Sequence, residues 1–212
     1  VYKELNPDAF SEVYVARGFF DQRYYKDGSM EGPGNYRDSS KFKKAAEEEG
    51  ISFIILDDYK KISNNLYATG TVERVVEKYN GPKGFYLDKD LTIPDIIRDD
   101  QSVGMLTDNG WIMMSGCGHS GIINTAMKLQ SIKNEPVYGA IGGFHLFKAS
   151  DNTISTTANW LKDNGLTKFM GGHCTGIYAA ETIADIIGIT RENLSHTAIG
   201  SVLTKELKII RS

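Results

Sequence analysis

The 212-residue chain is 41% hydrophobic and 24% charged, and its formal net charge is −3. This composition is typical of a folded globular protein and excludes a disordered one. There is no basic excess, which argues against a nucleic-acid partner, and no run of eighteen apolar residues that could cross a membrane. We therefore expect a single domain over residues 1–212.

The first quarter of the chain predicts short elements around an irregular segment. Residues 13–15 are strand-like, and from about residue 16 to residue 40 glycine, aromatic and charged residues mix without periodicity. A stretch of this length indicates an aromatic-rich insertion that forms a long irregular loop or a hairpin. Its rings could cover a substrate, or they could pack on the domain or on a partner chain. Residues 41–49 then predict a solvated helix, and residues 51–56 predict an apolar strand.

The next elements are strands followed by alternating strands and helices. Residues 66–73 alternate as an antiparallel strand does, and residues 102–115 predict a hairpin around an Asp-Asn-Gly turn. Ser120 is a candidate cap for a helix that buries its apolar side. Helices are also expected over residues 153–162 and around residues 180–187, and two short strands over residues 194–210.

Three of the four histidines follow the same local pattern. An apolar run of strand length ends in glycines and then in His119, His145 or His173. Loops at strand ends present reactive groups, and neutral imidazoles converging from separate strands are donors that zinc accepts. The pattern therefore predicts a metal site. His196 follows no glycines, and we expect it to pack or to lie on the surface.

The two cysteines each lie within two positions of one of these histidines. Cys117 precedes His119, and Cys174 follows His173. Two cysteines placed in this way indicate a reducing compartment, the cytoplasm, rather than a disulfide scaffold. We interpret both side chains as small buried residues.

Three motifs in order resemble the metallo-β-lactamase superfamily. They are residues 116–125 (GCGHSGIINT), residues 142–146 (GGFHL) and residues 173–176 (HCTG). Together with residues 68–74 and 99–101, they look like the branch of 7,8-dihydropterin-6-yl-methyl-4-(β-D-ribofuranosyl)aminobenzene-5'-phosphate synthases, which belongs to methanopterin biosynthesis. The resemblance implies an α+β fold, the αββα sandwich with a dinuclear site, usually zinc, at one edge of its sheets.

The resemblance also implies roles for single residues. His119 matches the metal ligand that follows the first ligand cluster, and His173 matches the last ligand. His145 stands where the superfamily commonly has a bridging aspartate, so it is either a substituted ligand or a catalytic acid or base. The first cluster, HxHxDH, is absent from these 212 residues. Because the chain also begins at Val1, we expect a fragment that lacks its N-terminal portion.

The function that the resemblance implies is a metal-dependent transferase. Such a synthase condenses a dihydropterin pyrophosphate with an aryl amine ribose phosphate and releases pyrophosphate. Arg17, Arg23 and Arg37 in the insertion are candidate phosphate ligands, with ordinary surface charge as the alternative. The other interpretations are a metal-dependent hydrolase of a phosphodiester, lactone or other ester, and a truncated non-catalytic module. Expected partners are a phosphate-bearing small molecule, an N-terminal fragment or partner chain, and a second copy of the chain.

Overall fold

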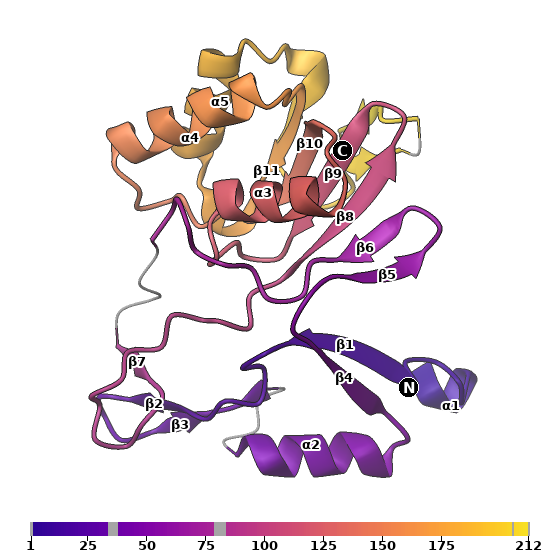
Figure 1. Ribbon diagram of the computed structural model, residues 1–212, viewed down its shortest axis with the longest axis vertical. Helices are drawn as coiled ribbons and strands as arrows, with labels where there is room; N and C mark the ends of the chain where they lie inside the picture. Colours follow the sequence, from indigo (N-terminus) through magenta and orange to yellow (C-terminus); the bar gives the residue numbers. More distant parts are fainter. Residues whose placement is uncertain (1, 34–37, 79–83, 205, 212) are drawn as a thin grey trace. The chain divides into compact units, whose positions relative to one another are not determined.

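The computed structural model describes residues 2–33, 38–78, 84–204 and 206–211 (Figure 1). The chain divides into two compact units: Val1–Asp58 with Asn80–Asp99, and Tyr59–Tyr79 with Asp100–Ser212. The segment expected as an insertion lies wholly in the first unit. The single domain expected over residues 1–212 remains a prediction.

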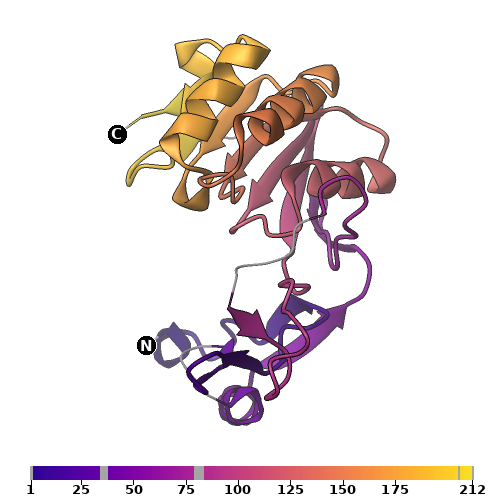
Figure 2. The same cartoon turned by 90° about the vertical axis from the view of Figure 1, so that its left-hand side faces the viewer.

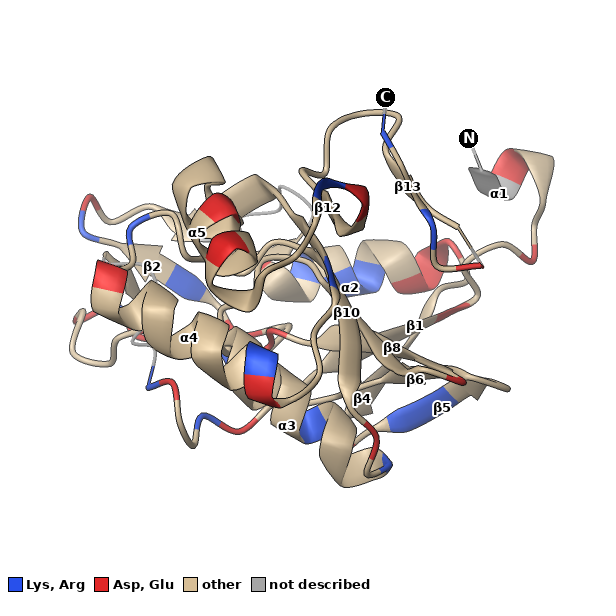
Figure 3. Cartoon of the chain, turned by 90° about the horizontal axis from the view of Figure 1, so that it is seen from above, with Lys and Arg blue, Asp and Glu red and all other residues tan. Residues whose placement is uncertain are grey.

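The first unit contains a parallel strand pair connected through a helix. After α1 (Tyr2–Leu5), strand β1 (Glu12–Ala16) pairs with β4 (Ser52–Leu56), and α2 (Ser39–Glu48) makes the crossover. The Asp38 carboxylate caps α2 by accepting from two backbone N–H groups. Figure 3 shows basic residues, in blue, in the first half of α2 and acidic residues, in red, in its second half. Lysine–glutamate pairs four residues apart link these halves, as a solvated helix allows.

Part of the expected irregular segment is ordered as a small antiparallel sheet. Its strands are β2 (Arg23–Tyr25), β3 (Met30–Glu31) and β7 (Phe85–Tyr86), with β2 in the centre. Phe19 and Phe20 pack against Phe42 and Phe53, with ring centroids 5.0–6.5 Å apart. Of the two interpretations for the aromatic residues, packing is therefore the one that the structure shows for Phe19 and Phe20.

A seven-stranded mixed sheet forms the centre of the second unit. Its order is β12-β11-β10-β9-β8-β6-β5, and β9 to β12 run parallel to one another. The bounds are β5 (Lys60–Ser63), β6 (Leu66–Ala68), β8 (Ser102–Thr107), β9 (Gly110–Ser115), β10 (Val137–Gly142), β11 (Lys168–Gly171) and β12 (Leu194–Ser195). A separate antiparallel pair consists of β13 (Val202–Leu203) and β14 (Ile209–Ile210).

The strand predicted over residues 66–73 is wrong beyond Ala68. The Thr69 hydroxyl accepts the backbone N–H of Ser102 at 2.9 Å, and the Thr69 N–H donates to the Ser102 carbonyl at 2.9 Å. A side chain thus takes the place of the next backbone acceptor, and the ladder between β6 and β8 ends there.

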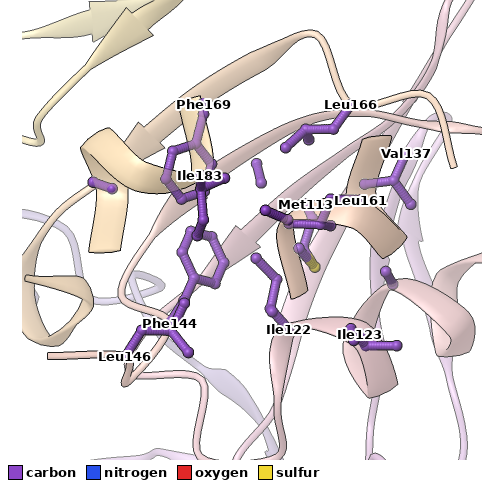
Figure 4. Close-up of a cluster of buried hydrophobic side chains, with 14 of the residues drawn as sticks. Met113, Ile122, Ile123, Val137, Phe144, Leu146, Leu161, Leu166, Phe169 and Ile183 are labelled. Atoms are coloured by element: carbon purple, nitrogen blue, oxygen red, sulfur yellow. The ribbon is translucent and has the colours of Figure 1, made fainter. Parts of the chain in front are cut away.

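Three helices lie against one face of this sheet (Figures 1 and 2). They are α3 (Ile122–Ile132), α4 (Asp151–Asp163) and α5 (Ile177–Ile187), with short 3₁₀ turns at His173–Thr175 and Arg191–Asn193. Their apolar sides and the strands bury a common core (Figure 4), in which Phe144 stacks on Phe169 at 5.6 Å between ring centroids. No helix in the described part of the chain is long and apolar enough to cross a membrane.

The start of α3 corrects the expected capping by Ser120. The N-cap residue is Gly121, and its position has no side-chain cap. Instead, the carboxylate of Glu77 accepts the N–H groups of Ile123 at 2.7 Å and Asn124 at 3.3 Å. A carboxylate at a helix N-terminus satisfies free donors and matches the helix dipole. Burial nevertheless raises the pKa of Glu77 above its ordinary value.

Asn124 fastens residues 75–77 to this helix, and we expect its replacement by alanine to destabilise the protein. Its side-chain oxygen accepts from Val75 and Val76, and its amide donates to the carbonyls of Glu77 and Ser120, at 2.7–3.1 Å. Alanine leaves these groups without partners, which lowers the free energy of unfolding by about 2–4 kcal/mol. Urea unfolding measures the loss.

The matched control for Asn124→Ala is Ser131→Ala, an exposed position on the same helix. A surface change of this kind alters stability by no more than about 0.5 kcal/mol. Equal unfolding midpoints for the two variants would show that the Asn124 contacts contribute little.

Candidate metal centre

The three histidines of the strand–glycine pattern lie beyond the carboxyl ends of three neighbouring parallel strands. His119 follows β9, His145 follows β10 and His173 follows β11, and these strands are adjacent in the sheet. The carboxyl edge of such a sheet is where ligands of α/β proteins bind. The rings of His119 and His145 lie close together, with centroids 4.4 Å apart.

The loops that carry these histidines approach one another so closely that a side chain at Gly143 would collide with its neighbours. A Cβ added to Gly143 would lie 2.5 Å from the carbonyl oxygen of Gly116 and 2.9 Å from the sulfur of Cys174. Glycine therefore permits the loop after β10 to run directly against the loops after β9 and β11. The donor groups of three separate chain segments converge for this reason.

Two of the histidines have a backbone conformation that residues other than glycine seldom adopt. The φ angles are 47° at His145 and 51° at His173, in the left-handed region. Residues held there cost about 1–3 kcal/mol each and cluster at ligand and active sites. The surrounding loops thus hold the backbone of both histidines against a local preference.

The two cysteines meet at the same place. Their sulfur atoms are 3.0 Å apart, and both thiols are free and half-buried. The Cys174 sulfur accepts the backbone N–H of His145 at 3.3 Å and lies 3.0 Å from the Cys117 carbonyl oxygen, to which it can donate when protonated. The Cys117 sulfur lies 3.6 Å from Nδ1 of His145.

The acid–base properties of two of these groups favour the protonation states that can donate an electron pair to a metal ion. The hydrogen bond from the Cys117 thiol lowers the pKa of Cys174 to about 4, and the same bond, with burial, raises the pKa of Cys117. We therefore assign the thiolate of the pair to Cys174. Burial lowers the pKa of His119 below 6.5, with the nearby His145 as the second cause, so His119 is neutral at pH 7.

Two groups of three donors have their ligand atoms within 4.8 Å of one another. One consists of Cys117, His119 and His145, and the other of Cys117, His173 and Cys174. Imidazole nitrogen and thiolate sulfur are the donors that zinc prefers, so the residues present fit a divalent zinc-like ion. The structure places His119 and His173 in different groups, which share the sulfur of Cys117.

The remaining candidates lie outside these groups. Arg17 is exposed and pairs with Asp57 at 2.7 Å, whereas Arg23 is largely buried between Asp95 and Asp99. Arg37 lies outside the described residues. The phosphate-binding role of these arginines stays a prediction. His196 binds the Glu181 carboxylate at 3.0 Å, in agreement with the surface or packing role expected for it.

The cysteines are the donors that sequence reasoning missed. They were expected to be small buried residues, yet they provide three of the six places in the two groups. A signal was present in the sequence, because each cysteine lies within two positions of a candidate ligand histidine. The spacing could not reveal that positions 117 and 174 meet, since that depends on the pairing of β9, β10 and β11.

Comparison with solved structures identifies the class of the fold. The chain is similar to Tm1679, whose crystal structure is described as that of a metal-dependent hydrolase of the β-lactamase superfamily. The TM-score is 0.68 at 21% identity, over 83% of this chain and 65% of that one. The expected α+β fold of the metallo-β-lactamases is thereby confirmed. No protein-family model matches the chain.

Sequence comparison points to a particular branch. The chain is 33% identical over 143 residues to 7,8-dihydropterin-6-methyl-4-(beta-D-ribofuranosyl)-aminobenzene-5'-phosphate synthase of Methanocaldococcus jannaschii, covering 65% of this chain and 48% of that protein. An uncharacterized protein of the same organism is 31% identical over 135 residues, covering 62% of this chain and 48% of its own length. The chain thus spans about half the length of these curated relatives. The resemblance to the superfamily and to its synthase branch is confirmed.

Proposed function

We propose that the chain carries part of the active site of a metal-dependent transferase that joins a dihydropterin to ribofuranosylaminobenzene phosphate and releases pyrophosphate. The observation that supports it best is the convergence of imidazole and thiol donors at the ends of β9, β10 and β11. Similarity to the synthase of M. jannaschii supports the substrate class. The free cysteines agree with an enzyme that acts in a reducing cytoplasm.

The site residues divide into donors and one proton carrier. His119 and His173 are the proposed metal ligands, and the lowered pKa of His119 keeps its imidazole in the form that binds metal. Divalent ions, one or two of zinc in the complete site, would neutralise the charge that develops on the leaving pyrophosphate. His145 lies beside His119 and is proposed to accept the proton that the aryl amine nitrogen loses as it attacks the pterin carbon.

A hydrolase is the second candidate function. The favouring observation is the fold shared with a protein described as a metal-dependent hydrolase. One fold hosts many reactions, so a phosphodiester, a lactone or another ester could occupy the same edge of the sheet. In that reaction His145 would take a proton from water instead of from an amine.

Product analysis tests the proposed function. The native protein, reconstituted with zinc, is incubated with the dihydropterin pyrophosphate and the aryl amine ribose phosphate, and mass spectrometry follows the products. We expect condensed product and pyrophosphate in equal amounts, with a loss of at least about tenfold in rate after chelation.

Parallel incubations with phosphodiester and lactone substrates provide the comparison. Ester hydrolysis without condensation would support the hydrolase instead. Zinc binding without any turnover would contradict both enzymes and support the module that needs a partner chain.

A further inference from the structure

We propose that Cys117, Cys174 and His173 form a thiolate-containing cation site that holds a borderline divalent ion such as zinc through two sulfurs and one imidazole nitrogen. The inference rests on the proposed function only in that the protein binds a divalent ion. It adds which atoms bind that ion. The resemblance to the superfamily assigns histidines to the metal, whereas the two sulfurs come from the geometry of this chain.

The three donor atoms lie within the reach of a single ion. They are within 4.8 Å of one another, and the sulfurs are 3.0 Å apart. Tetrahedral zinc with zinc–sulfur bonds of 2.3 Å places two sulfurs about 3.8 Å apart. The pair therefore needs to open by about 0.8 Å. The side chain of His173 is exposed and can turn towards the ion without disturbing the core.

The surroundings suit a bound thiolate. The backbone N–H of His145 points to the Cys174 sulfur at 3.3 Å, as an outer-shell donor does at a metal-bound sulfur. The absence of a side chain at Gly143 keeps the space beside this sulfur open, because a Cβ there would approach it to 2.9 Å. Three protein ligands also leave one tetrahedral position for a substrate or water oxygen.

The position of Cys117 links this site to the imidazole pair. Its sulfur also belongs to the group of His119 and His145, and it lies 3.6 Å from Nδ1 of His145. The thiolate site therefore adjoins the donors that the resemblance implies. Thiolates favour zinc over magnesium or calcium, so the sulfurs make the site selective for soft and borderline ions.

The same two sulfurs have one competing chemistry, a disulfide. Two thiols would lose two electrons and two protons to an oxidant such as glutathione disulfide, which becomes two glutathione thiols. Bond formation requires the sulfurs to close from 3.0 Å to about 2.05 Å. A disulfide removes the thiolates and excludes the proposed ion, so the two outcomes can be told apart.

X-ray absorption at the zinc edge tests the proposal on the full chain, stripped with chelator, reduced and reconstituted with zinc. We expect a sulfur shell at about 2.3 Å in addition to nitrogen and oxygen at about 2.0–2.1 Å. Cys174→Ser and Cys117→Ser should remove or halve that shell and weaken zinc affinity by at least about tenfold. His196→Ala, a histidine outside both groups, is the matched control and should change neither quantity.

Circular dichroism and melting temperature show whether each variant is folded, and His173→Ala provides a third test that leaves both sulfurs in place. Zinc bound only through nitrogen and oxygen would overturn the thiolate site while leaving metal dependence intact. A protein that turns over without binding zinc would contradict metal dependence itself. A disulfide that persists in reductant, detected as a mass 2 Da lower, would also overturn the proposal.

Discussion

Replacing His119 with alanine is expected to lower bound zinc and turnover together. Its imidazole is half-buried beside His145, and burial lowers its pKa, so the neutral ring is available as a donor at pH 7. Loss of an outer-shell partner alone reduces metal affinity or activity by about 10–100-fold, and loss of a ligand should do at least as much. We expect a decrease of about 100-fold or more in turnover. Zinc analysis of the purified variant is the accompanying measurement.

His173→Ala should show the same joint loss, and His196→Ala should show neither. His196 contacts Glu181 at the surface and belongs to neither donor group. Because His119 is partly buried, thermal unfolding must accompany each assay to separate ligand loss from a folding defect. If both His119→Ala and His173→Ala keep their full zinc content, the metal roles of these two histidines are wrong.

The local pattern of the sequence predicted the strands that carry these histidines. Parallel strands buried on both faces appear as continuous apolar runs, as in residues 111–115 and 137–141. Glycines at their ends marked the turns, and strands β9 and β10 start and end within one residue of these two runs. The convergence of His119 and His145 follows from parallel neighbours, whose ends meet at one edge of the sheet.

The features that escaped prediction depend on contacts between distant segments. Cys117 and Cys174 are 57 positions apart, and Glu77 caps a helix that begins 45 positions later. A local pattern of capping residues favoured Ser120, whereas the partly buried carboxylate of Glu77 caps the helix instead. The division into units also interleaves residues 59–79, which belong to the second unit, and residues 80–99, which belong to the first.

Gly142→Ala is expected to destabilise the second unit strongly. Gly142 has a φ of 121°, and a Cβ there would lie 1.9 Å from the carbonyl oxygen of Ser115 on the paired strand β9. Its own carbonyl accepts the N–H of Gly172 at 3.0 Å. Moving this backbone therefore separates the loops that carry all three histidines. We expect the free energy of unfolding to fall by about 3–5 kcal/mol.

Gly188→Ala separates the two causes of that loss. Gly188 ends α5 with a φ of 82°, and nothing lies within 4 Å of an added Cβ. Alanine there bears only the conformational penalty, about 1–2 kcal/mol. Urea unfolding of both variants gives the difference, which measures the close approach of β9 and β10. If Gly142→Ala loses no more free energy of unfolding than Gly188→Ala, the loops have room to separate without unfolding the sheet. The zinc content of Gly142→Ala then shows whether the donor groups still converge.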